Sequence, residues 1–245
     1  MDLNCFYKPN SPLYEGLEKL FIKKDFFDKD MEQMKKLAKD CHDFWLNQVK
    51  SFKGSSIKYI LIGEAPPFSE DDVAYVYNPA SKNTHWQTRI LKAFSIDEES
   101  KEDAFAKLRD EGFLLIDLFP YPAKFGEVDH GQAYKELIDL SVEHYLPKLL
   151  QLLDDKLNKD VKVAFAMKRF GHHINEVLEK DDGVKGYDIF SKDKLNWKLE
   201  TIGVKTYTNK DNNVIKRLSC YENVIADQSG NPNSSLIRYS FKLTK

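Results

Sequence analysis

Residues 58–69, with the sequence KYILIGEAPPFS, change abruptly from apolar to polar character. The apolar run 59–62 is too short for a helix but is long enough for a buried strand. Pro66 and Pro67 cannot continue a strand or a helix, so the chain must turn there. Ligands bind at the carboxyl ends of the strands in open α/β sheets. Glu64 is therefore a candidate active-site residue, and a solvated surface loop is the alternative.

The composition is that of a globular protein with an ordinary core. The chain has 245 residues, of which 42% are hydrophobic and 31% are charged, and its formal net charge is −2. This charge excludes a global basic field that attracts nucleic acid. The N-terminus does not resemble a secretory signal, and no apolar run is long enough to span a membrane. Three widely spaced cysteines favour reduced thiols. We therefore expect a cytoplasmic monomer without a metal or other cofactor.

Predicted strands and helices alternate along the chain. Residues 1–54 predict a helical N-terminal leader, because apolar residues recur there at every third or fourth position. Uninterrupted apolar stretches near residues 60, 115, 163 and 225 predict four buried strands. Together these patterns predict one α/β domain over residues 1–245, a three-layer α/β/α sandwich with a central, mostly parallel four-stranded sheet.

Two segments depart from the simple alternation. Residues 183–222 have weak patterning around the turn-forming run 210–213, and we expect a peripheral hairpin insertion there. An amphipathic helix is predicted from Tyr134 to Leu153, but Pro147 lies inside it. Proline cannot sit in a helix interior without loss of a hydrogen bond, so the helix should kink or break near that residue.

Polar residues end three of the predicted strands. Glu64 follows the first strand, Asp117 ends the second, and residues 227–230 (DQSG) follow the last. The carboxyl ends of parallel strands lie at one edge of a sheet, so these groups should converge on one crevice.

This order of motifs resembles the uracil-DNA glycosylase superfamily. Residues 63–66 (GEAP) are similar to the Gly-Glu-Ala-Pro-Gly run in the iron–sulfur branch of that superfamily, and residues 117–120 and 227–230 match its later motifs in position. The resemblance covers residues 56–241 in the order of elements. It implies a uracil-DNA-glycosylase-like fold and, as partner, DNA or a nucleobase or nucleotide ligand.

The resemblance also implies roles for individual residues. Glu64 would orient water or stabilise the sugar cation, and Asp117 would read the base, so these two are the expected catalytic residues. An aromatic residue after the first motif would stack on the flipped-out base, and the candidates are Phe68, Tyr75 and Tyr77. The implied substrate-binding residues are Gly63, Ala65, Pro66, Phe68, Tyr77, Asp227, Gln228 and Ser229.

Two departures from the family pattern change the expected chemistry. Asp117 stands where the family typically has an asparagine, and an ionised aspartate only accepts hydrogen bonds. It therefore favours a base with an exocyclic amino group over uracil. Asp227 stands in place of the usual histidine and adds negative charge where the base anion would develop. We therefore expect weak or absent uracil excision. Three cysteines are also too few for the iron–sulfur cluster of the similar branch.

These observations lead to three functional hypotheses. The first is a DNA N-glycosylase, a hydrolase of the base–sugar bond, with an altered base preference. The alternative is a non-catalytic nucleic-acid or nucleotide-binding protein that retains the fold and the pocket. The third is a small-ester hydrolase that uses Ser229. It is the weakest of the three, because no Gly-x-Ser-x-Gly motif surrounds this residue.

Two other patterns have an ordinary explanation beside a functional one. His172-His173 with Glu176 would suit a metal pair, but such residues are more typical of a solvated helix start. Basic residues at 168–169, at 216–217 and at Arg238 would suit a phosphate-binding rim, although charged surface residues are usually only solvated.

Overall fold

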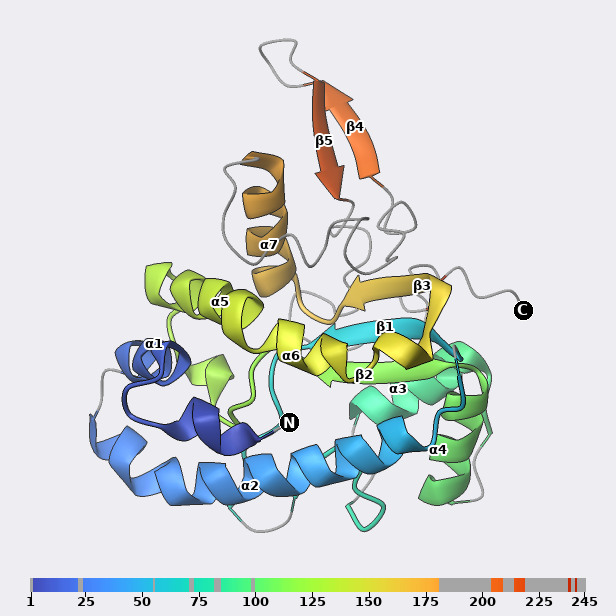
Figure 1. Cartoon of the computed structure of the whole chain (residues 1–245), viewed down its shortest axis with the longest axis horizontal. Helices are drawn as coiled ribbons and strands as arrows, with labels where there is room; N and C mark the ends of the chain where they lie inside the picture. Colours follow the sequence, from blue (N-terminus) through green and yellow to red (C-terminus); the bar gives the residue numbers. More distant parts are fainter. Residues whose placement is uncertain are drawn as a thin grey trace.

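A parallel sheet of three strands forms the centre of the computed structural model (Figure 1). The structure describes residues 2–21, 24–54, 56–70, 73–81, 85–97, 100–180, 204–208, 214–218, 238 and 241. In the sheet, β1 (Ile57–Gly63) lies between β2 (Phe113–Asp117) and β3 (Leu157–Phe165). The mixed α/β class and the parallel sheet agree with the sequence prediction. The predicted fourth strand, near residue 225, lies outside the described residues.

The register of the sheet brings the carboxyl ends of the strands to one edge. Gly63 at the end of β1 is the partner of Asp117 at the end of β2. On the other side of β1, Ile62 is the partner of Phe165 at the end of β3. Because β1 is central, Ile60, Leu61 and Ile62 are fully buried, as expected for a strand covered on both faces.

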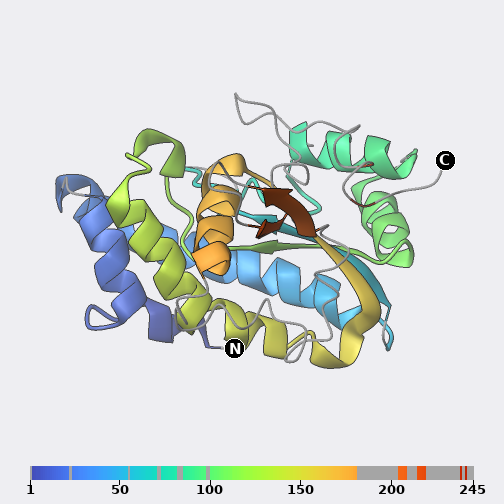
Figure 2. The same ribbon diagram turned by 90° about the horizontal axis from the view of Figure 1, so that it is seen from above.

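The connection from β1 to β2 contains α3 (His85–Phe94) and α4 (Lys101–Asp110). Ser100 caps α4, because its side chain accepts a hydrogen bond from the Asp103 N–H. Gly112 follows α4 with a φ of 83°, a left-handed conformation that suits glycine at a helix end. These helices lie on one side of the sheet, opposite the helices of the next connection (Figure 2).

The connection from β2 to β3 contains α5 (Gln132–His144) and α6 (Leu146–Gln151). The predicted break near Pro147 is confirmed, and it falls at Tyr145. Pro147 lies in the first turn of α6, where its missing N–H would have no helical partner in any case. Two short 3-10 helices, η2 (Phe125–Glu127) and η3 (Asp154–Lys156), flank this helix pair.

The N-terminal leader consists of η1 (Leu3–Tyr7), α1 (Pro12–Leu20) and α2 (Lys24–Lys50). The Ser11 hydroxyl accepts a hydrogen bond from the Tyr14 N–H at 3.3 Å and so caps α1. Apolar side chains of both α1 and α2 belong to the same buried cluster as the strands. The leader therefore contributes directly to the core of the sheet.

Side chains cover the free edge of β2. Trp45 on α2 donates its indole N–H to the Leu115 carbonyl oxygen at 3.1 Å. The Leu115 N–H in turn donates to the Tyr77 hydroxyl at 2.6 Å. An exposed strand edge carries unpaired backbone groups that favour aggregation. Here two amphipathic aromatic side chains pair the N–H and the carbonyl group of Leu115.

The chain after β3 forms α7 (Lys168–Lys180), which begins at the carboxyl edge of the sheet. In the region expected to form a peripheral hairpin, β4 (Val204–Thr208) and β5 (Val214–Leu218) pair antiparallel with each other. Near the C-terminus, Phe241 is fully buried against Tyr59 and Phe94.

Candidate active site

The loops after β1 and β2 stay paired beyond the ends of the strands. The Leu118 N–H donates to the Gly63 carbonyl oxygen at 2.9 Å, and the Phe119 N–H donates to that of Glu64 at 2.8 Å. These bonds extend the ladder into the Gly-Glu-Ala-Pro turn. Glu64 and Asp117 are 8% and 7% exposed, so both carboxyl groups are held at this edge away from bulk solvent.

A cavity of about 260 Å³ lies at the same edge. Its polar lining consists of Glu64, Asp117 and Tyr75. Its apolar lining comes mainly from Ala65, Pro67, Ala74, Val76, Leu115 and Met167. Sites for drug-sized ligands measure about 300–1,000 Å³. The size and lining therefore suit a small ligand of one ring system that makes a few directed hydrogen bonds.

Asp117 forms part of the cavity surface and is fixed by two neighbours. The Tyr75 hydroxyl donates to Asp117 Oδ2 at 3.0 Å. Asp117 Oδ1 faces the backbone of Gly63, where an added Cβ would lie 3.0 Å from this oxygen. Glycine at position 63 thus gives the carboxyl group the space it occupies.

Burial raises the pKa of Asp117 to about 7, and the hydrogen bond from Tyr75 opposes this rise only in part. Among the described residues, no positive charge contributes to the pKa of this carboxyl. The pKa values of Tyr75, Tyr145 and Cys41 are also raised. Burial is the largest cause and the charge of Asp117 is the second, so these groups stay neutral.

The raised pKa changes a premise of the sequence analysis, which treated Asp117 as ionised. A carboxyl group with a pKa of about 7 is roughly half protonated at neutral pH. In the protonated form it both donates and accepts hydrogen bonds, as an asparagine amide does. Because Tyr75 already donates to Oδ2, the acidic proton is best placed on Oδ1.

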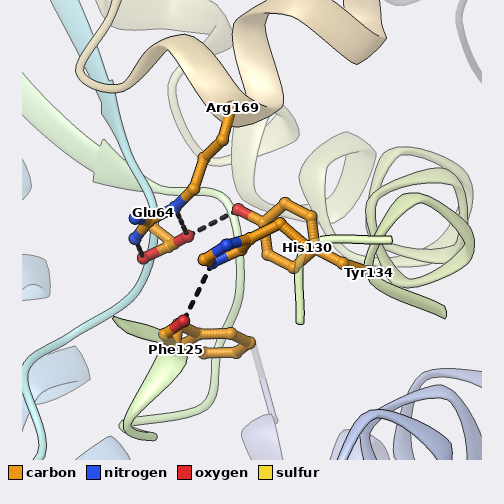
Figure 3. Close-up of polar contacts among 5 residues, drawn as sticks. All are labelled: Glu64, Phe125, His130, Tyr134 and Arg169. Carbon is orange, nitrogen blue, oxygen red and sulfur yellow. Dashed lines mark hydrogen bonds and ion pairs between the residues drawn. The ribbon is translucent and has the colours of Figure 1, made fainter. Parts of the chain in front are cut away.

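Glu64 is held by two donors on its side of the cavity (Figure 3). The Tyr134 hydroxyl donates to Glu64 Oε1 at 2.5 Å, and Arg169 Nε donates to the same oxygen at 2.6 Å. Arg169 Nη2 pairs with Glu64 Oε2. This is the bidentate arrangement that gives arginine–carboxylate pairs their directionality.

The guanidinium of Arg169 remains charged in this setting. Partial burial acts to lower its pKa, but the hydrogen bonds and negative charge of Glu64 outweigh burial and raise it. Burial and the nearby Glu64 charge also raise the pKa of Tyr134, so the phenol keeps the proton that it donates.

Tyr134 is positioned by contacts of its own. The ring of His130 packs edge-on against the Tyr134 ring, with centroids 4.8 Å apart. His130 Nε2 lies 2.9 Å from the Phe125 carbonyl oxygen, which can only accept, so Nε2 carries the proton (Figure 3). These contacts orient the phenol toward Glu64.

The structure brings together some of the residues predicted for the site and separates others. Gly63, Glu64, Ala65 and Asp117 line the 260 Å³ cavity. Pro66 lines a second, small cavity of about 20 Å³, which Asp117 and Tyr75 also line.

The three candidate stacking residues occupy different places. Tyr75 lines the cavity. Tyr77 is 4% exposed, packs edge-on against Phe105 and supports the β2 edge. Phe68 is half-buried, and the Lys124 ammonium lies 5.3 Å from the centre of its ring. Asp227, Gln228 and Ser229 lie outside the described residues. The hydrolase hypothesis depends on Ser229 and is therefore not tested by the structure.

Sequence reasoning assigned no site role to Tyr134 and considered Arg169 only as a rim residue. Tyr134 reads as one more member of the apolar stripe of its helix. A buried tyrosine needs a partner for its hydroxyl, which is a signal that a polar group lies nearby. That signal does not say which of the many acidic residues the partner is.

Neither a metal cluster nor a membrane span is found in the described part of the chain. No group of three or more His, Cys, Asp and Glu side chains there is arranged to hold a metal ion. His173 is instead paired with Asp139 on α5 at 2.8 Å. No described helix combines the length and the apolar character needed to cross a membrane.

Comparisons with models of protein families, with curated proteins and with solved structures gave no match.

Replacement of Gly63 by alanine should disturb the cavity more than the fold. The new Cβ would lie 3.0 Å from Asp117 Oδ1 and 3.6 Å from the Ile116 carbonyl oxygen. We expect the carboxyl to move by a few tenths of an ångström, at a cost of about 1 kcal/mol in stability. Urea unfolding and the titration of the Asp117 carboxyl by carbon NMR would check this. An unchanged carboxyl resonance and pKa would contradict the assigned contact.

Proposed function

We propose that the cavity binds a nucleobase and that the protein is a uracil-DNA-glycosylase-like N-glycosylase. The observation that carries this proposal is that Glu64 and Asp117, at the carboxyl ends of adjacent parallel strands, line one small and mainly apolar cavity. The order of the Gly-Glu-Ala-Pro turn, the strand ending at Asp117 and the following helices adds support from the motif resemblance.

Asp117 would read the edge of the base. In the protonated form, its Oδ1 hydroxyl can donate to a carbonyl oxygen such as O4 of uracil, while the carboxyl still accepts from an N–H group. In the ionised form it only accepts, which favours an exocyclic amino group. Base preference would therefore follow the protonation of Asp117, with carbonyl-bearing bases favoured below a pH of about 7.

Protonated Asp117 would also assist bond cleavage. Breaking an N-glycosidic bond develops negative charge on the base and positive charge on the sugar. A hydrogen bond from Oδ1 to a base oxygen strengthens as the anion forms, whereas an ionised carboxylate would oppose that charge. Glu64 would stabilise the sugar cation or orient the attacking water.

A panel of oligonucleotides tests this function. The DNA would carry uracil, hypoxanthine, xanthine or a mismatch, and alkali would reveal abasic sites after incubation at pH 6 and at pH 8. We expect strand cleavage for a carbonyl-bearing base at pH 6, reduced by about tenfold at pH 8 because fewer molecules have a protonated Asp117. Glu64→Gln is the control. Equal abasic-site formation by wild type and Glu64→Gln on every substrate would remove the catalytic proposal.

The second candidate is a non-catalytic base or nucleotide binder. It is favoured by the state of Glu64, whose two oxygens already accept three hydrogen bonds from Tyr134 and Arg169. A carboxylate occupied in this way has little remaining capacity to orient a water molecule. Ligand binding without abasic-site formation in the same panel would support this candidate.

A further inference from the structure

Arg169 is more exposed to solvent than the carboxylate that it binds. Its side chain is 28% exposed, whereas that of Glu64 is 8% exposed. Arg169 lies in the first turn of α7, two residues after Met167, which lines the cavity together with Ala166. Its Nε and Nη2 atoms contact Glu64. Because Glu64 itself lines the cavity, the guanidinium that binds it lies beside the cavity wall, and part of the Arg169 side chain is exposed to solvent.

We propose that Arg169 is a phosphate-responsive cap on Glu64. Without ligand, its guanidinium occupies both carboxylate oxygens and keeps Glu64 from acting. When a nucleotide enters the cavity, an adjacent phosphodiester group attracts the guanidinium and frees Glu64 Oε2. This inference rests on the proposed nucleobase pocket and names Arg169 as the positioning residue that couples backbone binding to the activation of Glu64.

Arg169 can exchange the Glu64 carboxylate for a phosphate because both anions bind the same pair of guanidinium N–H groups. Both accept two parallel N–H hydrogen bonds, and the charge-assisted bonds are of similar type. Water alone does not displace the arginine, because a neutral molecule offers the guanidinium no anionic partner. A phosphate can do so, because it offers Arg169 a second anionic partner.

Tyr134 limits the destabilisation of Glu64 when Arg169 moves away. A buried carboxylate that loses its only partner is strongly destabilised. After Arg169 moves, the Tyr134 hydroxyl still donates to Oε1. Oε2, whose hydrogen-bond partner among the described residues is Arg169, then becomes available to a water molecule. The cap thus releases one oxygen and leaves the other held.

The proposal predicts that affinity depends on backbone phosphates through Arg169. A free nucleoside fills the cavity without attracting the guanidinium, so it should bind wild type and Arg169→Gln about equally. A trinucleotide with two phosphodiester groups should bind wild type about tenfold more tightly than it binds Arg169→Gln, as expected for loss of one charge-assisted contact. Glu64→Gln should bind the trinucleotide more tightly than wild type, because the carboxylate no longer competes.

The test compares 2′-deoxypseudouridine with the trinucleotide thymidine–2′-deoxypseudouridine–thymidine, both titrated at pH 6, because the carbon–carbon glycosidic bond of these ligands cannot be hydrolysed. The Nε–Hε resonance of Arg169 in wild type reports the cap without any substitution, and calorimetry gives the affinities of wild type, Arg169→Gln and Glu64→Gln. We expect the trinucleotide alone to shift the Arg169 resonance. Binding of both ligands with an unmoved resonance, or an equal loss of affinity for both in Arg169→Gln, would overturn the cap and leave the pocket. Failure of both ligands to bind would overturn the pocket first, and the cap with it.

Discussion

Asp117→Asn is expected to be more stable than the wild type at pH 8, by about 2–4 kcal/mol, and to have a similar stability at pH 4. The pKa of Asp117 rises from 3.8 to about 7 on folding, because burial penalises the ionised form. Each pKa unit corresponds to about 1.4 kcal/mol, which sets an upper limit of about 4 kcal/mol on the effect. The folded state binds this proton more tightly than the unfolded state. The stability from Asp117 is therefore complete below a pH of about 4 and is lost as the pH rises through about 7.

Urea unfolding of the two proteins between pH 4 and pH 9 measures this difference. Subtracting the wild-type free energy of unfolding from that of Asp117→Asn removes the contributions of the other titrating groups. Tyr75→Phe is a matched control, since loss of the Tyr75 hydrogen bond should move the decline to a higher pH. A difference that stays constant across this range would mean that Asp117 ionises in the folded protein as freely as in water.

Arg169→Gln is expected to destabilise the protein by about 2–3 kcal/mol, because it leaves the Glu64 carboxylate without its charged partner. Breaking a fully buried ion pair costs about 3–5 kcal/mol. Arg169 is 28% exposed, and partial solvation of the site should reduce this cost. The double variant Arg169→Gln with Glu64→Gln should recover at least half of the loss, since no unpaired charge remains.

A double-mutant cycle from urea unfolding gives the coupling energy between Arg169 and Glu64. Lys135→Gln provides a comparison, because it breaks another ion pair of α7, that of Lys135 with Glu176. Both of those side chains are more than a third exposed, and we expect a cost below about 1 kcal/mol. A coupling energy for Arg169 and Glu64 as small as the effect of Lys135→Gln would show that the Glu64 pair is not the buried interaction described here.

The strand-and-turn pattern around residues 58–69 was sufficient to predict the centre of the fold. Its apolar run is short, is followed by prolines and recurs around residues 115 and 163, which is typical of parallel strands in an α/β sheet. The convergence of Glu64 and Asp117 followed from the same pattern, because parallel strands end at a common edge. In the structure, Asp117 is the register partner of Gly63, which directly precedes Glu64, and both carboxyl groups line one cavity.

The protonation state of Asp117 could not be predicted in this way. It depends on how completely α2, the loop after β1 and the start of α6 enclose the carboxyl, and on the neutral character of Cys41, Tyr75 and Tyr145. These residues are far apart in sequence. Burial of a charge by distant segments leaves no local pattern, so the ordinary pKa of an aspartate was the only available starting point.

The partners of Glu64 escaped prediction for a related reason. Arg169 and Tyr134 are 105 and 70 residues away in sequence. Arg169 looks like one of many surface cations, and Tyr134 like one of many core aromatics. Tyr77 shows the reverse case, because its position after the first motif suggested ligand stacking, while in the structure its hydroxyl pairs with the edge of β2.

The most direct test of the account is a calorimetric titration of the wild type and Asp117→Asn with uracil at pH 6 and pH 8. Wild-type affinity should fall about tenfold between these pH values, because the protonated fraction of Asp117 falls from about nine-tenths to about one-tenth. Asparagine donates and accepts at both pH values, so Asp117→Asn should bind uracil with the same affinity at each. Absence of binding to either protein, or an equal pH dependence in both, would contradict the central claim that Asp117 reads a nucleobase in this cavity.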